Sequence, residues 1–446
     1  MNYKIKTAVG AIVLALAGLP TAFAGVSTQE AEQLKSTLTP LGGEKAGNKD
    51  GSIPAWTGAA IKSGKDLFAG EKPLYSVNST NMGSYADKLS DGVKALLNKY
   101  PNSFRLDVYP THRTAAAPQW VYENTAKNAV SAKIGNDGLT LEGAYGGVPF
   151  PIPKSGQEVH WNHLLQWRGE SVEYRMKVWA ITASGEAVLA TGGITYEQFP
   201  YYRKDGKGKY GGVFLQALQA TESPPFRAGE AILMHEQADY TKDRLIWQYL
   251  AGQRRVRRAP NIGFDTPDFA ASGVRFFDEP FGWMGSPERF DFKLVGKKEM
   301  LVPYNNNKLL STKDVEAIGA HHLKPEHVRW ELHRVWVVEA TLKKDKRHAV
   351  PKRVVYYDED SWGTLIMDGW DAQGKLWHTS LSLPFVVGDL PAVTSGCTDA
   401  FFNIQTGAWV YSCAMGDTPA DQQYRAVTPR NDTFFSSDAL SGFSAR

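Results

Sequence analysis

The chain has 446 residues and a formal net charge of +3, from 50 lysines and arginines against 47 aspartates and glutamates. Hydrophobic residues make up 42% and aromatic residues 12%, so the chain can bury a large core and is not a disordered polar chain. The near balance of charges argues against a nucleic-acid partner, which would call for a clear excess of basic residues.

The first residues show the three parts of a secretory signal peptide. Lys4 and Lys6 precede an apolar run from Ala8 to Leu19, and Ala22-Phe23-Ala24 gives the small-x-small pattern of a cleavage site. The run is shorter than the ~20 residues of a membrane-spanning helix. We therefore expect residues 1–24 to be removed, the net charge to fall to +1, and the mature protein to be free in the periplasm of a Gram-negative bacterium.

The chain has two cysteines, Cys397 and Cys413, on either side of a predicted hairpin. The turn at Gln405-Thr406-Gly407 would place them nearly opposite each other. Because the periplasm is oxidising, we predict a Cys397–Cys413 disulfide, which would stabilise the fold by about 3 kcal/mol. A register that separates the two sulfurs would instead leave two thiols. The absence of a C-x-x-C pattern favours a structural role.

Local signals predict three helices in residues 25–168, which we expect to form an N-terminal arm with helices. Ser27 with Glu30, and Ser155 with Glu158, have the spacing of capping boxes and begin two of these helices. Apolar spacing predicts the third helix at residues 85–100. The stretches between them lack helical periodicity, and we expect an arm, an irregular segment and an extended Pro-rich run at residues 44–58, 111–147 and 146–153.

From about residue 170 to 415 the apolar pattern has period two. Short turns join the successive runs, as in the hairpin at 245–258 and the meander at 352–382, so neighbouring strands should pair antiparallel. We therefore predict a mainly β (α+β) fold in which residues 170–415 form one large antiparallel sheet or open barrel. Residues 416–446 would be a C-terminal tail, and residues 25–446 a single domain.

The familiar catalytic motifs are missing from the sequence. There is no G-x-S-x-G nucleophile elbow and no H-E-x-x-H metal site. His160 and His163 lie one turn apart, but helix packing explains them better than metal binding. The acidic run Asp358-Glu359-Asp360 lies between strands and is interpreted as a solvated turn. We therefore predict no catalytic residue, no metal ligand and no cofactor.

A row of arginines and several aromatic residues are the candidate binding residues. In a strand, Arg255 and Arg257 point to one side and form a row suited to an anionic headgroup or an acidic partner. An exposed edge strand protected by charge is an equally good interpretation. Trp247 and Tyr249 lie opposite that row, and with Trp336 they are candidates for the wall of an apolar cavity inside the sheet.

Six segments together resemble a known bacterial family, the one catalogued as domain of unknown function 1329. They are LTPLGGEKAGNKDGSIPAWTG at 38–58, GGVPFPIP at 146–153, WNHL at 161–164, WQYLAGQRRVRRAP at 247–260, GSPERFD at 285–291 and VRWELHRVWVVEA at 328–340. The resemblance covers essentially all of the mature chain, and the length of the motifs makes it specific.

The resemblance implies a fold related to the LolA and LolB-like lipoprotein carriers, which are half-open antiparallel barrels with helices covering or plugging an apolar cavity. It also implies an outer-membrane protein and an RND-type transporter as partners. The leading hypothesis is therefore a periplasmic carrier, without enzymatic activity, for a lipid, lipoprotein or other hydrophobic ligand in envelope transport and outer-membrane biogenesis. The alternatives are an accessory or sensor module docking on an outer-membrane complex and, less favoured, an esterase-type enzyme.

Overall fold

The structure is a computed structural model that describes residues 23–58, 67–259, 262–394 and 397–443. Residues 1–22 of the expected signal peptide lie outside the described residues, and residues 23–24 form strand β1. Among the described helices, none has both the length and the apolar character needed to cross a membrane.

The helices are short and lie mostly in the N-terminal part. The capping boxes at Ser27 and Ser155 are both present, so the two predicted helix starts are confirmed. The predicted helix at 85–100 is confirmed in its second half, after a 3-10 turn. The described α-helices are α1 (Thr28–Ala31), α2 (Asp91–Lys99), α3 (Gln119–Ser131), α4 (Gly156–Leu164), α5 (Asp314–Ala317) and α6 (Ser437–Leu440).

Helix α3 contradicts the irregular segment expected at 111–147. Its N-cap is Pro118, which has no capping side chain, and its buried face includes the polar residues Thr125 and Asn128. Both residues have partners outside the helix, because Asn128 Nδ2 donates to the Gly147 carbonyl at 2.9 Å and Thr125 Oγ1 accepts from Val148 N at 3.0 Å. Tertiary hydrogen bonds therefore contribute to this helix in addition to its local propensity.

One large sheet dominates the molecule. It runs in the order β11-β10-β9-β8-β7-β6-β20-β19-β16-β15-β14-β13-β3-β2, and β12 and β21 pair with β13 and β6. Its strands are β2 (Tyr75–Val77), β3 (Leu106–Val108), β6 (Ser171–Ile181), β7 (Ala187–Gln198), β8 (Val213–Ser223), β9 (Ala231–Gln237), β10 (Leu245–Leu250), β11 (Arg255–Arg258), β12 (Phe290–Pro303), β13 (Trp330–Leu342), β14 (Lys352–Asp358), β15 (Thr364–Trp370), β16 (Leu376–Ser382), β19 (Asp399–Asn403), β20 (Trp409–Ala414) and β21 (Arg425–Ala426). The smaller sheets pair β1 (Phe23–Ala24), β4 (Lys133–Gly135) and β5 (Thr140–Glu142), and β17 (Phe385–Val387) with β18 (Ala392–Thr394).

The mainly β class is confirmed, but two details of the prediction are wrong. The sheet is open and not closed into a barrel, because the short strand β11 ends it on one side and β2 and β12 lie on the other. The sheet is also not wholly antiparallel, since β3 from the N-terminal part pairs parallel with β13 at Trp330 and Val108. Both edges carry charge, with arginines in β11 and lysines such as Lys293 and Lys298 in β12, which disfavours further pairing.

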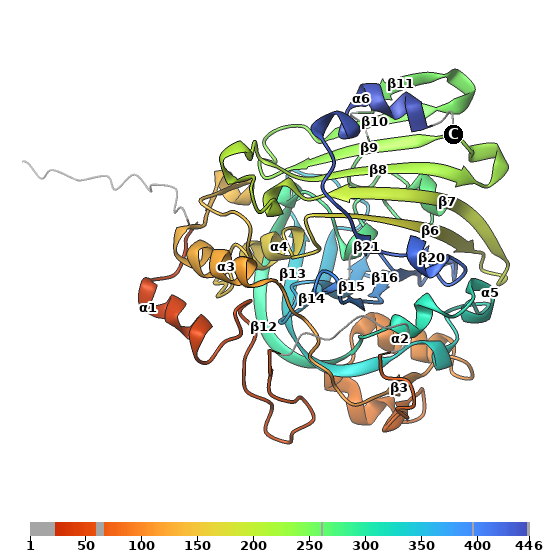
Figure 1. Cartoon of the computed structure of the whole chain (residues 1–446). Coiled ribbons are helices and arrows are strands. Elements are labelled where there is room, and N and C mark those ends of the chain that lie inside the picture. Colours follow the sequence, from red (N-terminus) through yellow and green to blue (C-terminus); the bar gives the residue numbers. More distant parts are fainter. Residues whose placement is uncertain (1–22, 59–66, 260–261, 395–396, 444–446) are drawn as a thin grey trace, which may run out of the picture.

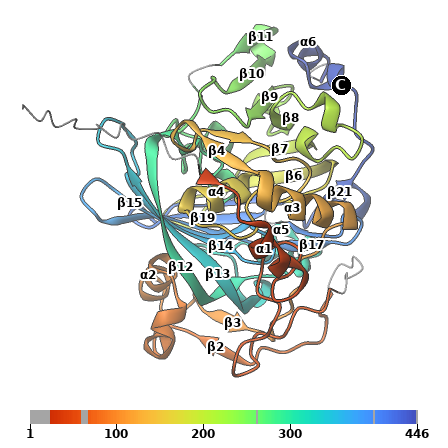
Figure 2. The ribbon, with the colours of Figure 1, turned by 90° about the vertical axis from the view of Figure 1, so that its left-hand side faces the viewer.

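Helices and loops cover both faces of this sheet. Figure 1 shows the C-terminal helix α6 beside β10 and β11 at one end of the molecule, with α2 and β3 at the other. Figure 2 shows α1, α3 and α4 together on one side, where α4 packs on β12 and β13. The segment at residues 431–443 packs on the outer face of β8–β10, where Phe435 and Leu440 contact Leu218 and Leu233. The outer face of these strands is therefore covered by the C-terminal segment, and only their inner face is left for other contacts.

Candidate functional site

A cavity of about 150 Å³ lies on the inner face of strands β6–β10. Residues 262–285, here called the covering segment, close it from the other side. The lining is mainly apolar, with a few polar groups between the apolar side chains. The main apolar contributors are Met176, Val178, Ala217, Ile232, Met234, Phe269, Phe277, Phe281 and Met284.

Strand register explains why these side chains meet. Tyr174 pairs with Thr195, Thr195 with Gln219, Gln219 with Ile232, and Ile232 with Gln248, which forms one row across five strands. Every member of this row lines the cavity. Because side chains alternate along a strand, the neighbouring row points to the outer face and packs against the C-terminal segment.

The covering segment is fixed to the sheet by buried charges. Arg275 is 5% exposed, and its Nε donates to Asp268 Oδ2 at 2.9 Å within the segment. Its Nη1 donates to Asp399 Oδ2 at 3.1 Å and to Ser412 Oγ at 2.8 Å, which lie on β19 and β20. One arginine thus joins the two carboxylates across the contact between the segment and the sheet.

A second buried anchor lies further along the segment at Asp278. Its carboxylate accepts hydrogen bonds from Arg353 Nη1 at 3.0 Å and from His348 Nε2 at 3.1 Å. Burial alone would raise the pKa of Asp278, but Arg353 and His348 outweigh this effect and lower it to about 2. The adjacent Glu279 contacts His378 Nδ1 at 2.8 Å on β16. The covering segment is therefore held by ion pairs and not only by apolar packing.

Two arginines connect the edges of the cavity to the covering segment. Arg244 pairs with the buried Glu236 of β9 and donates from Nη2 to the Met284 carbonyl at 3.0 Å. Arg227 donates to the Phe269 carbonyl at 3.2 Å and lies over the Phe269 ring at 5.5 Å. Both arginines also line the cavity, so the same side chains form part of its wall and hold the covering segment in place.

One ionisable group points into the apolar wall without an ion-pair partner among the residues that the structure describes. Glu197 on β7 is 2% exposed and is hydrogen-bonded to Tyr174. Burial raises its pKa, and the charge of Arg168 and the Tyr174 hydrogen bond oppose the rise. Glu197 therefore gives the mainly apolar lining a buried acidic group that can orient a ligand.

The two cysteines also lie in this wall. Cys397 and Cys413 are both buried, both line the cavity, and are free thiols in the structure, so the predicted disulfide is not formed there. Their side chains are within hydrogen-bonding reach of each other, and burial raises the pKa of Cys413 well above its usual value. The hairpin register pairs Asp399 with Ser412, which sets the cysteines diagonally and not directly opposite. The disulfide stays a prediction for the protein in an oxidising compartment.

The structure does not bring the five predicted binding residues together. Trp247 and Tyr249 do lie together, on the outer face of β10 in the cluster with the C-terminal segment, and Tyr249 also borders the cavity. Arg255 and Arg257 are exposed on β11 and pair with Leu250 and Gln248, so they share the cavity's face but lie beyond its edge.

Trp336, the fifth predicted binding residue, lies on β13. It stacks on Trp362 with ring centroids 6.3 Å apart, away from the cavity lining.

Sequence reasoning missed the covering segment altogether. Its four buried charged residues, Asp268, Arg275, Asp278 and Glu279, stand among phenylalanines at 269, 276, 277 and 281. Charged residues interleaved with aromatic ones in a loop are a signal that could have marked a segment bound against a polar part of the core.

A second, open cleft of about 1460 Å³ is lined in part by residues 262–266 and Gly285, at the two ends of the covering segment. Many of its lining residues are charged, but with both signs, and several pair with each other, as Lys346 does with Glu288 at 2.8 Å. Arg244 lines both hollows. Because the charges of the cleft largely compensate one another, the apolar cavity is the better candidate for a specific site.

Comparison with known sequences agrees with the motifs. The family model described as "Protein of unknown function (DUF1329)" matches residues 76–441. A protein of Pseudomonas aeruginosa, "Uncharacterized protein PA3922", is 40% identical over 386 residues, which cover 82% of this chain and 84% of that protein.

Comparison with solved structures gives partial matches. A putative outer membrane lipoprotein-sorting protein domain from Vibrio parahaemolyticus has a TM-score of 0.43 at 16% identity and covers 64% of this chain and 98% of its own. A DUF1329 family protein from Desulfovibrio piger has a TM-score of 0.40 at 16% identity, with coverages of 61% and 92%. The LolA superfamily protein NE2245 from Nitrosomonas europaea has a TM-score of 0.36 at 11% identity, with coverages of 64% and 100%.

Proposed function

This chain belongs to the DUF1329 family, and from its covered cavity we propose that it is a periplasmic binding or carrier protein for a lipid or other hydrophobic ligand. The observation that carries the proposal is the apolar cavity between the inner face of β6–β10 and a segment fixed by buried ion pairs. A chain that needed only a filled core would pack this face to full density. The ligand's apolar part would lie against Met176, Met234 and Phe281, with Glu197 as the polar contact.

The volume of the cavity limits what it holds in this arrangement. About 150 Å³ is the size of an engineered cavity that admits benzene, whereas pockets for larger ligands measure ~300–1,000 Å³. The closed cavity therefore fits one ring or a short part of an acyl chain. In our proposal a longer chain enters when the contacts of Arg227 and Arg244 with the covering segment open.

A second candidate function is docking on an acidic partner in the envelope. The observation in its favour is the row of Arg255 and Arg257, exposed at the edge of the sheet. Replacing both by alanine would weaken capture of such a partner without changing ligand binding in the cavity. The outer-membrane protein and RND-type transporter implied by the family resemblance are the first partners to test.

The proposal is tested first by native mass spectrometry of the protein purified from the periplasm, followed by organic extraction and lipid analysis. The structure offers a matched pair of variants, because Ala217 and Met234 are direct neighbours across β8 and β9 and both line the cavity. Ala217→Phe fills the cavity and should abolish binding. Met234→Ala enlarges it, at a cost of about 2–5 kcal/mol in stability, and should retain or increase binding.

The two variants separate a cavity effect from a loss of folding. Reduced binding by Ala217→Phe alone, with both variants folded by circular dichroism, supports the carrier. Equal binding by the wild type and Ala217→Phe would show that the cavity is not the ligand site. An apo mass for the wild type, together with no uptake of added fatty acids, would favour the docking function.

A further inference from the structure

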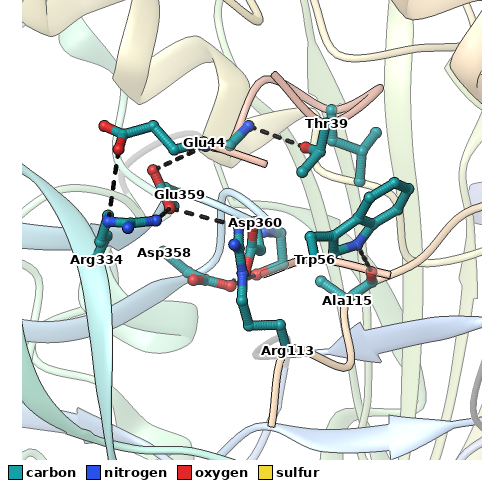
Figure 3. A network of polar contacts seen from close by, with 12 residues as sticks. Thr39, Glu44, Trp56, Arg113, Ala115, Arg334, Asp358, Glu359 and Asp360 are labelled. Carbon is teal, nitrogen blue, oxygen red and sulfur yellow. Dashed lines mark hydrogen bonds and ion pairs between the residues drawn. The ribbon is translucent and has the colours of Figure 1, made fainter. Parts of the chain in front are cut away.

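The acidic run Asp358-Glu359-Asp360, expected to be a solvated turn, is buried. The three residues are 0%, 2% and 3% exposed. The N-terminal arm lies over them, because Glu44 N donates to Glu359 Oε2 at 3.2 Å and Trp362 Nε1 donates to the Leu41 carbonyl at 2.8 Å. Figure 3 shows this network between the arm, Arg113 and Arg334.

Two of the three carboxylates have cationic partners. Asp360 receives two hydrogen bonds from Arg113, Nε to Oδ2 at 2.8 Å and Nη2 to Oδ1 at 2.6 Å. Glu359 lies 2.8 Å from Lys297 Nζ and 3.3 Å from Arg334 Nη1. Their burial is therefore compensated in the ordinary way.

Asp358 is different. Its Oδ2 accepts hydrogen bonds from Tyr304 Oη at 2.8 Å and from Ser361 Oγ at 2.6 Å. Its Oδ1 is buried without any hydrogen-bond partner, and within the described ranges no ion pair involves this residue. A buried polar atom without a partner destabilises the folded protein. A cation bound at Asp358 Oδ1 would remove this destabilisation.

His333 completes the cluster from the neighbouring strand β13. It is 1% exposed, and its ring lies 3.8 Å from the Tyr304 ring. Its Nε2 lies 2.9 Å from Glu331 Oε2. A carboxylate on one ring nitrogen fixes the orientation of a histidine whose other nitrogen binds a metal, so Glu331 is placed as an outer partner of such a site.

We propose that His333, Asp358 and Asp360 bind a divalent transition-metal ion of the Zn²⁺ or Mn²⁺ type. Ligand atoms of the three side chains lie within 4.8 Å of one another. Atoms bonded to one ion at ~2 Å lie roughly 3–4 Å apart, so small side-chain rotations bring them to bonding distance. Imidazole together with carboxylates suits Zn²⁺ or Mn²⁺, whereas Ca²⁺ and Mg²⁺ prefer oxygen alone.

The ion would have a structural role. It would join β13 to the turn after β14, directly beneath the N-terminal arm. Gly43 of the arm is close enough to this turn that a Cβ added there would lie 2.5 Å from Asp360 Oδ1. Arg113, which holds Asp360, also donates to the Pro54 carbonyl at 3.4 Å. Metal binding and the seating of the arm are therefore coupled through Asp360.

The test measures Zn and Mn by plasma mass spectrometry in the mature protein, purified without chelators or metal-affinity columns. About one equivalent of ion per chain is expected, and Asp358→Asn, which keeps the shape of the side chain, should lower it roughly tenfold or more. Asp368→Asn is the matched control, because Asp368 is equally buried but lies outside the cluster, and it should retain the ion.

A second measurement does not depend on a variant that folds. Wild-type protein dialysed against chelator should melt at a lower temperature and recover when Zn²⁺ or Mn²⁺ is added, and Asp358→Asn should not respond. Less than a tenth of an equivalent in the wild type, with no change of melting temperature on adding either ion, would overturn the proposal. So would a response to Ca²⁺ alone, because it would exclude the histidine as a ligand.

Discussion

Replacing Arg275 by methionine tests whether buried charge holds the covering segment. The guanidinium is 5% exposed and contacts Asp268, Asp399 and Ser412. Methionine has a similar length but leaves two buried carboxylates without a cation. Removing one partner of a buried ion pair costs about 3–5 kcal/mol, mostly because the remaining charge is uncompensated, and we expect a loss of that size.

The loss should depend on pH with a definite sign. Burial already raises the pKa of Asp399, and Arg275 opposes that rise. Without Arg275 the pKa of Asp399 in the folded protein should be higher still. The ionised Asp399 carboxylate then lowers the free energy of unfolding more than the protonated form does. The deficit of Arg275→Met relative to the wild type should therefore be largest near about pH 7.5 and shrink toward about pH 5, where Asp399 takes up a proton more readily than it does in the unfolded chain.

The assay is urea unfolding followed by tryptophan fluorescence, with limited proteolysis of residues 262–285 to detect release of the covering segment. The triple variant Arg275→Met/Asp268→Asn/Asp399→Asn removes the charges together and should recover most of the lost stability. An unchanged urea midpoint for Arg275→Met, or a triple variant no more stable than the single one, would refute the reasoning.

Two further predictions concern other buried groups. Oxidation of the purified protein should join Cys397 and Cys413, detected as a loss of two hydrogens in the intact mass, and should raise stability by about 3 kcal/mol over the reduced form; Cys413→Ser should abolish both effects. Burial raises the pKa of Asp368 to about 7, although a hydrogen bond from Gly92 N opposes the rise. The unfolded chain ionises this group near pH ~3.9, so the cost of burying it rises with pH between about pH 4 and about pH 7. Asp368→Asn should therefore be more stable than the wild type at about pH 8, and this advantage should shrink steadily as the pH falls from about 7 toward about 4. A pH-independent difference in urea midpoints would contradict this.

The elements that the sequence predicted well depend on contacts within a few residues. The capping boxes at Ser27 and Ser155 join residues three apart, and the hairpin ending at Arg258 depends on a short turn between alternating strands. These signals are local, so they can be recognised in the sequence without knowledge of the fold. Helix α3 shows the opposite case, because it has no capping side chain and its buried polar residues Thr125 and Asn128 are hydrogen-bonded to residues 145–148.

The sequence by itself determined the β class, the family and most strand positions, because period-two patterning and long motifs are written along the chain. Only the tertiary structure decided which strand face lies inside, since the Tyr174-to-Gln248 row depends on the register of five strands. It also placed Trp247 and Trp336 in different parts of the molecule and buried Asp358 beneath an arm some 300 residues earlier in the chain. The environment of a side chain is set by packing between segments that are distant in the sequence. The contacts of the covering segment and of the acidic cluster form only when the chain folds and brings these segments together.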